Sequence, residues 1–229
     1  MKQPRSRART RTAWRAPRNL ALSPRHAQTG GGKLLRRGFS TDSLGVNNAA
    51  VPDVVYYVAA SLDGYIATSD GGIQWLSPFE GKSEDYGYAA FYASVDAVLL
   101  GRRTYEQCLT FGEWPYPGKP CWVFSRRRIE VTQPGVTLTD QDPVQVVNEL
   151  KAKRLRRAWL VGGGGLAGSF RKQGLISEYI VSIIPVILGA GVPLFASGGA
   201  LEALKLVETT PYPSGVVQLR YRRSNGLPS

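Results

Sequence analysis

The chain has 229 residues, of which 43 % are hydrophobic and 20 % charged, a composition that is ordinary for a soluble globular domain. Its length suits one domain of generous size, or a domain with an appendage. The sequence contains no uninterrupted apolar run of the ~20 residues that a membrane helix needs, so we do not expect a membrane protein.

The formal net charge of +12 is concentrated at the amino-terminal end. Residues 1–50 carry eleven basic residues and one acid, Asp42, whereas the remainder carries 18 basic and 16 acidic residues, a net charge of only +2. The basic character therefore belongs to the tail and says little about the ligand of the domain. We do not expect the domain to bind nucleic acid.

Residues 1–50 are rich in Arg, Ser, Thr and Pro and lack sustained helical periodicity. Two interpretations have equal weight: an organellar transit peptide, or a translation start assigned too early in a GC-rich genome. A basic arm that contacts nucleic acid is a weaker third. We therefore predict a disordered tail over 1–50 and a single domain over 51–225. We expect a cytoplasmic protein, or one of the mitochondrial or plastid matrix if the tail is a transit peptide.

The cysteines and the histidine limit the chemistry of the domain. Cys108 and Cys121 do not form a CxxC pair, so the sequence supports neither a metal site nor a disulfide framework. The single histidine, His26, lies in the tail. A Ser-His-Asp triad and a histidine-ligated metal are thus excluded from the domain, and its chemistry must depend on carboxylates, water, tyrosine or a cofactor.

From Val51 onward, predicted strands and helices alternate. Apolar runs predict strands that begin at 54 and strands over 96–101, 120–125, 157–162 and 178–188, and capping and periodicity predict helices over 83–95, 103–109, 142–154 and 165–174. Two extended runs around "PYPSG", within 204–223, predict a terminal hairpin. This alternation indicates an α/β fold with parallel neighbouring strands and right-handed crossovers.

The residues that directly follow the predicted strands indicate a phosphate-bearing ligand. The stretches are "GRRT" at 101–104, "SRRR" at 125–128 and "GGGG" at 162–165. Arginine forks and the backbone amides of a glycine loop both bind phosphate oxygens. Because ligands bind at the carboxyl ends of parallel strands, several such stretches indicate a dinucleotide. The late position of the glycine loop argues against a Rossmann fold, whose glycine motif opens the first βαβ unit.

Eight motifs together resemble the dihydrofolate reductase-like proteins, most closely the bacterial stand-alone branch related to the reductase domain of riboflavin biosynthesis. They are "VAASLDGYIA", "GGIQWL", "EDYGY", "LLGRRTYE", "GEWPY", "VFSR", "LVGGGGLAGSF" and "PVILGAGVPLF", which occur in family order across residues 53–222. The resemblance implies a three-layer sandwich whose mostly parallel central sheet ends in an antiparallel C-terminal hairpin. It also implies NADPH as the cofactor and a homodimer formed through the C-terminal strands.

The resemblance assigns the cofactor-binding residues in three groups. The phosphates would meet Gly101, Arg102, Arg103 and Thr104, and the adenosine ribose with its extra phosphate would lie near Ser125 and Arg126. The pyrophosphate and nicotinamide would pass over Gly162, Gly163, Gly164 and Gly165, with a cis peptide between the first two and Leu166 starting the next helix, while Ala59 and Ile66 would flank the nicotinamide. Alternative interpretations are a solvated turn for Arg126, a solvent-facing side chain for Arg103 and a tight strand-to-helix joint for the glycines.

The substrate residues are less strongly indicated. Asp85 is the candidate catalytic acid, because related reductases place a substrate-binding acid at about this distance before the second strand; alternatively, it favours the dipole of the following helix. Asp63 is a candidate substrate contact, although a turn with Gly64 is the favoured interpretation. Trp75 is expected to line the pocket or join the core, and Tyr86 could hydrogen-bond the substrate.

These features predict an NADPH-dependent reductase. It would transfer a hydride to a C=N or C=O bond of a pterin- or pyrimidine-like small molecule, as dihydrofolate reductase and 5-amino-6-(5-phosphoribosylamino)uracil reductase do. The alternative is a non-catalytic NADPH-binding regulatory protein of the same fold. No metal is expected in either case.

Overall fold

The computed structural model describes residues 50–80, 84–224 and 226. The interpretations of the tail and the expected first residue of the 83–95 helix therefore lie outside the described residues. The elements are β1 (Asp53–Ser61), β2 (Tyr65–Ala67), the 3-10 helix η1 (Gln74–Phe79), α1 (Tyr88–Ser94), β3 (Ala97–Gly101), α2 (Arg102–Cys108), the 3-10 helix η2 (Leu109–Phe111), β4 (Cys121–Phe124), β5 (Val136–Thr139), α3 (Pro143–Ala152), β6 (Arg157–Gly162), α4 (Gly164–Lys172), β7 (Glu178–Ile184), β8 (Val192–Pro193), β9 (Leu204–Pro211) and β10 (Val217–Arg223).

The central sheet has eight strands in the order β5-β4-β3-β6-β1-β7-β10-β9. The first six strands in this order, β5-β4-β3-β6-β1-β7, pair in parallel. β10 pairs antiparallel with both β7 and β9. β2 and β8 form a separate antiparallel pair. The predicted fold class, a mostly parallel sheet with an antiparallel C-terminal hairpin, is confirmed.

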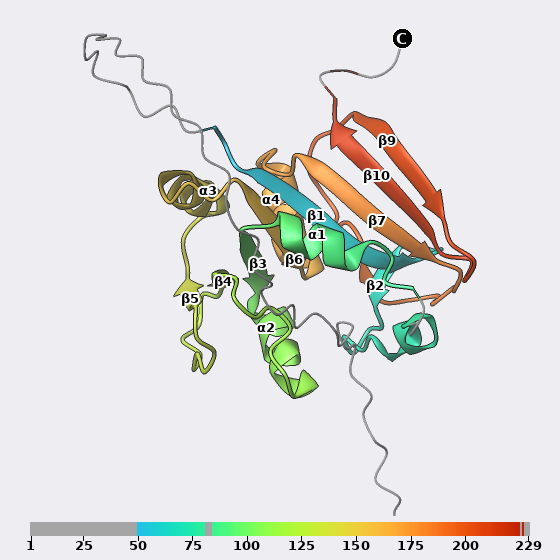
Figure 1. The fold of residues 1–229 in the computed structure, drawn as a ribbon, viewed down its shortest axis with the longest axis horizontal. Helices are drawn as coiled ribbons and strands as arrows, with labels where there is room; N and C mark the ends of the chain where they lie inside the picture. Colours follow the sequence, from blue (N-terminus) through green and yellow to red (C-terminus); the bar gives the residue numbers. More distant parts are fainter. Residues whose placement is uncertain (1–49, 81–83, 225, 227–229) are drawn as a thin grey trace, which may run out of the picture.

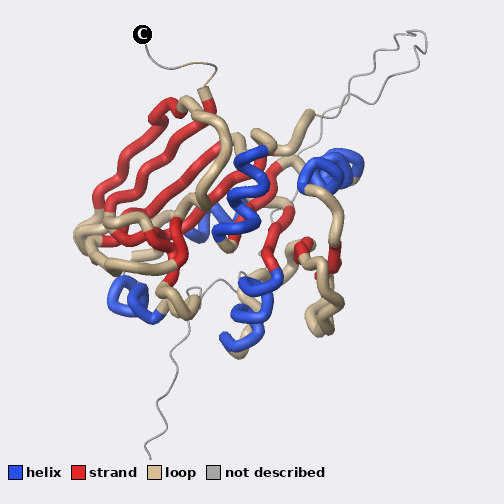
Figure 2. The backbone as a smooth tube through the Cα atoms, turned by 180° about the vertical axis from the view of Figure 1, so that it is seen from behind, coloured by secondary structure: helices blue, strands red, loops and turns tan. Residues whose placement is uncertain are grey.

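Helices cover both faces of this sheet, which makes three layers (Figure 1). On one face, Val147 and Leu150 of α3 and Phe170 of α4 belong to a core cluster with Tyr56 and Leu160 of the sheet. On the other face, α1 and α2 contribute side chains to a second cluster with β1, β3 and β6. In Figure 1, α1 lies on the near side of the sheet. In Figure 2, which views the molecule from behind, α4 lies on the near side.

Two boundaries differ from the sequence prediction for identifiable reasons. α1 begins at Tyr88 rather than at 83, because Tyr86 and Gly87 adopt left-handed backbone angles, with φ of 52° and 75°, that a helix cannot include. β7 ends at Ile184 rather than at 188, because Pro185 has no amide to donate to the ladder.

Short strands were missed. β5 is a four-residue edge strand with the sequence VTLT, and β2 and β8 contain three and two residues. Runs this short carry little periodicity, so their pairing depends on tertiary contacts.

Within the described ranges, none of the helices combines the length and the apolar character that a membrane crossing requires. The same residues contain no cluster of three or more His, Cys, Asp or Glu side chains placed to hold a metal ion. Both cysteines are free and buried.

Candidate functional site

A large cleft of about 1490 Å³ runs along the carboxyl edge of the parallel strands. Its floor includes Tyr57 and Ala59 of β1, the end of β3 at Gly101 and the start of α4. The segment 69–80 and the residues before α1 form the opposite wall. Single small-molecule pockets usually measure roughly 300–1,000 Å³, so this cleft has room for a cofactor and a substrate together.

The glycine loop has a specific backbone geometry in this cleft. Gly162 ends β6 with φ of +111°, and the peptide bond between Gly162 and Gly163 is cis, as the resemblance implies. A Cβ on Gly164 would lie 3.0 Å from the carbonyl oxygen of Pro193, so the loop also packs tightly against β8. A Cβ on Gly165, by contrast, would meet no atom within 4 Å. Gly163, Gly164, Gly165 and Leu166 line the cleft, whereas Gly162 is buried behind them.

The first arginine stretch lies beside the glycine loop. Gly101 ends β3, and a Cβ there would lie 3.4 Å from the carbonyl oxygen of Gly162, so the two strand ends approach closely. Arg102, Arg103 and Thr104 open α2 and line the cleft. Both carboxylate oxygens of Glu106 accept hydrogen bonds from Nη1 of Arg102, at 2.7 and 2.8 Å. The Arg103 side chain is exposed at the mouth of the cleft.

Ser125 and Arg126 lie at the same edge of the sheet but outside the lining of the cleft. Phe124, the last residue of β4, pairs with Gly101, which places Ser125 and Arg126 just beyond the end of the neighbouring strand. The Ser125 hydroxyl donates to the carbonyl of Arg127 at 2.6 Å and accepts from its amide at 3.1 Å. The local contacts therefore form a turn, and the exposed Arg126 extends from it.

Ala59 and Ile66 both line the cleft, from β1 and from β2. Ile66 also lies 4.0 Å from where a Cβ on Gly164 would be, so Ile66 borders the glycine loop. The structure thus brings predicted residues from β1, β2, the end of β3 and the loop after β6 to one cleft.

Asp85 and Tyr86 line the wall that faces the cleft before α1. The Tyr86 hydroxyl donates to the carbonyl of Phe79 at 2.9 Å, and its ring packs edge-on against Tyr212 with centroids 4.9 Å apart. Its backbone oxygen accepts hydrogen bonds from the Tyr57 hydroxyl at 3.3 Å and from Gln218 at 3.2 Å. Tyr86 therefore ties this wall to β1 and to the β9–β10 hairpin.

Two predicted substrate residues lie outside the lining of the cleft. The Asp63 carboxylate accepts hydrogen bonds from the Ser61 hydroxyl at 2.6 Å and from the amides of Leu188 and Gly189 at 3.1 and 2.7 Å. These hydrogen bonds lower the pKa of Asp63, and the bond from Ser61 has the largest effect. They give Asp63 a structural role, in line with the turn interpretation. Trp75 lies in η1, half-buried, while its neighbours Ile73 and Leu76 border the cleft.

Several lining residues were missed from the sequence. Glu80 and Glu84 join Asp85 on the wall, and burial raises the pKa of Glu80. Tyr57 and Ser182 contribute polar groups to the floor. A serine inside the apolar run "YIVSIIPVIL" was the available signal, since a polar side chain in a buried strand needs a partner.

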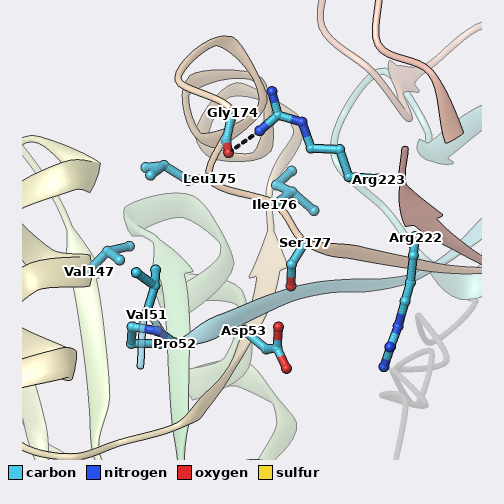
Figure 3. A pocket seen from close by; sticks show the side chains of 10 residues that line it. All are labelled: Val51, Pro52, Asp53, Val147, Gly174, Leu175, Ile176, Ser177, Arg222 and Arg223. Atoms are coloured by element: carbon cyan, nitrogen blue, oxygen red, sulfur yellow. Dashed lines mark hydrogen bonds between the residues drawn. The ribbon is translucent and has the colours of Figure 1, made fainter. Parts of the chain in front are cut away.

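A smaller hollow of about 350 Å³ lies at the opposite, amino-terminal edge of the sheet. Figure 3 shows Asp53 and Ser177 at the starts of β1 and β7, and Arg223 donating to the carbonyl of Gly174 at 2.6 Å. None of the residues that the sequence singled out for function lines this hollow.

Comparisons with known proteins identify relatives of this chain. The uncharacterized protein YwjB of Bacillus subtilis is 39 % identical over 171 residues, which cover 74 % of this chain and 97 % of YwjB. A Shewanella protein described as a candidate riboflavin biosynthesis protein has a crystal structure with a TM-score of 0.70 and 31 % identity, covering 76 % of this chain and 99 % of that one.

More distant solved structures share the fold alone. The deaminase/5-amino-6-(5-phosphoribosylamino)uracil reductase of Thermotoga maritima has a TM-score of 0.58 at 16 % identity, covering 76 % of this chain and 57 % of its own. Dihydrofolate reductase of Enterococcus faecalis, in complex with NADP(H), has a TM-score of 0.57 at 14 % identity, covering 76 % and 97 %. The fold is thus one that reductases use. Residues 52–218 match the family model of the RibD C-terminal domain, and the chain belongs to this family.

Proposed function

We propose that this protein is an NADPH-dependent reductase acting on a pterin- or pyrimidine-like small molecule. The observation that carries the proposal is the meeting of the glycine loop, the arginine pair and Ala59 on one face of a 1490 Å³ cleft. A fold shared with a dihydrofolate reductase in complex with NADP(H) supports the same conclusion.

The residues present fit such a cofactor. Gly165 leaves open space at the start of α4, where backbone amides and the helix dipole favour an anion. Arg102 and Arg103 supply two guanidinium groups at the same rim. The pyrophosphate would lie across these groups, with Ser125 and Arg126 near the adenosine ribose and Ala59 and Ile66 beside the nicotinamide.

When bound, the reduced nicotinamide would supply a hydride to the carbon of a C=N or C=O bond, and an acid such as Asp85 or a water molecule would supply the proton to the nitrogen or oxygen. The chain must hold the substrate carbon against that ring in the orientation that hydride transfer requires. Asp85 is the proposed catalytic and substrate-binding acid, because its carboxylate borders the cleft and can accept N–H groups of a heterocycle. The hydrogen bonds of Tyr86 with Phe79, Tyr57 and Gln218 would hold the neighbouring Asp85 in position.

The test is NADPH oxidation by the purified chain against a panel of dihydropterins, pyrimidines and small carbonyl compounds, followed at the absorbance of the reduced nicotinamide. The proposal expects turnover of at least one heterocycle. NADPH binding without turnover of any compound would favour the alternative, a non-catalytic NADPH-binding regulatory protein.

We further propose a homodimer formed through the C-terminal strands. β9 is the last strand of the sheet, so one of its edges has no partner strand among the described residues. Leu206 and Val207 of this strand are 50 % and 47 % exposed. Unpaired edges with exposed apolar side chains tend to be covered, and a second copy of the chain is the proposed cover.

A further inference from the structure

Ser182 is a buried hydroxyl group that borders the cleft from β7. Ser182 is 7 % exposed, and its neighbours along the strand, Val181 and Ile183, are apolar. The amide of Gln218 donates to the Ser182 oxygen at 3.1 Å. The Ser182 proton has no acceptor among the residues that the structure describes. A buried donor that faces a cleft without an acceptor points to an acceptor on a ligand.

The surrounding hydrogen bonds leave the Ser182 proton available to an acceptor in the cleft. Gln218 Nε2 also donates to the backbone oxygen of Tyr86 at 3.2 Å and lies 3.4 Å from the Tyr57 hydroxyl. An amide nitrogen cannot accept, so the Ser182 proton cannot return to it. The Tyr57 proton is directed to Tyr86 as well, and burial raises the pKa of Tyr57 to about 12, so this network stays neutral near pH 7.

The strand register places Ser182 beside the expected site of hydride transfer. Ser182 pairs with Ala59 of β1 on one side and with Gln218 of β10 on the other. Neighbouring strands lie about 4.8 Å apart, and paired side chains point to the same face. Ser182 is therefore one strand spacing from the residue that the proposed function puts against the nicotinamide.

We propose that Ser182 determines substrate specificity by donating a hydrogen bond to a ring carbonyl oxygen of the substrate. The inference rests on the proposed function, and it narrows the substrate class to planar heterocycles that carry an oxo group, in preference to their amino analogues. An amino group in place of the oxygen would present a donor to a donor. Gln218 and Tyr57 act through Ser182 and are positioning residues.

The test compares two probes that differ at one position: pterin, which has a ring carbonyl, and diaminopteridine, in which an amino group replaces that carbonyl. Affinities for the full chain saturated with NADP⁺ are measured by calorimetry for the wild type, Ser182→Ala and the control Ser177→Ala. Ser177 is the matched control because its hydroxyl donates to the carbonyl of Val54, away from the cleft.

Loss of one hydrogen bond predicts that Ser182→Ala weakens pterin binding about tenfold and diaminopteridine binding less than threefold. Ser177→Ala should change neither affinity. Equal losses for both probes, no loss for either, or no binding of pterin by the wild type would overturn the inference.

The coenzyme affinity separates this inference from the proposed function. Ser182→Ala should bind NADPH as the wild type does, since the serine contacts the substrate. Absence of NADPH binding by the wild type contradicts the proposed function. If NADPH binds normally but Ser182→Ala changes the affinities for pterin and diaminopteridine equally, only the role of Ser182 is contradicted.

Discussion

The carboxylate of Asp85 receives two backbone hydrogen bonds at the start of α1, one from the amide of Gly87 to Oδ1 at 2.9 Å and one from the amide of Ala89 to Oδ2 at 3.1 Å. The same residue borders the cleft. Each carboxylate oxygen can accept a second hydrogen bond, so Asp85 can stabilise the helix and still bind a substrate N–H group. The two interpretations of Asp85 that the sequence left open are compatible.

Asp85→Asn should separate these roles. The amide retains one acceptor and so keeps one of the two cap hydrogen bonds, and the free energy of unfolding should fall by about 1 kcal/mol. Turnover of the reducible heterocycle should fall about hundredfold, because an amide cannot replace a carboxylate as acid or base, while the NADPH dissociation constant stays unchanged. Asp140→Asn, at an exposed carboxylate beyond β5, is the control. Unchanged turnover in Asp85→Asn would remove Asp85 from the chemistry.

Two glycines of the loop should respond differently to alanine. Gly165→Ala adds a methyl group to open space, so the fold should remain stable, but the group would occupy the proposed path of the coenzyme and weaken NADPH binding at least about tenfold. Gly162→Ala must hold alanine at φ of +111° and should lower the free energy of unfolding by about 1–3 kcal/mol. Thermal unfolding and calorimetry measure both effects. Wild-type NADPH affinity in Gly165→Ala would place the coenzyme elsewhere.

The proposed dimer predicts a solution mass of twice the 25.0 kDa chain in analytical ultracentrifugation. Leu206→Asp puts a charge on the exposed strand β9 and should shift the protein to monomer. Leu201→Asp changes an even more exposed leucine outside the strands and should leave the dimer intact. A monomeric wild type at micromolar concentration contradicts the dimer.

Both thiols should resist alkylation in the folded protein. Cys108 and Cys121 are 3 % and 1 % exposed, and burial raises the pKa of each to about 12. The reactive thiolate is therefore scarce at pH 8 and grows only as the pH rises toward 12. Iodoacetamide at pH 8 should modify the native chain at least about a hundredfold more slowly than the chain in concentrated guanidinium chloride. Equal rates would show that α2 and β4 do not bury these side chains.

The sequence was sufficient for the larger elements because their signals are local. Continuous apolar runs predicted β1, β3, β4, β6 and β7, and Asp142 followed by Pro143 predicted the start of α3, where the structure has a capping box. The short strand β5 and the left-handed Tyr86 carry no comparable signal, because contacts from distant segments determine both.

The cleft shows the same division. Residues that lie just beyond strand ends, such as Arg102 and Gly165, could be placed at one edge from chain order alone. Ser182 could not, because its relation to Ala59 and Gln218 depends on the register of three strands. The roles of Asp63 and Asp85 likewise depended on which backbone amides reach their carboxylates.

Calorimetric titration of the purified chain with NADPH tests the central claim most directly. A coenzyme held by two arginines and the glycine loop should bind with a micromolar dissociation constant, about −8 kcal/mol, and NADH should bind more weakly if Arg126 meets the extra phosphate. Absence of heat at about millimolar NADPH would mean that the binding free energy is weaker than about −4 kcal/mol. That result would contradict the proposed function.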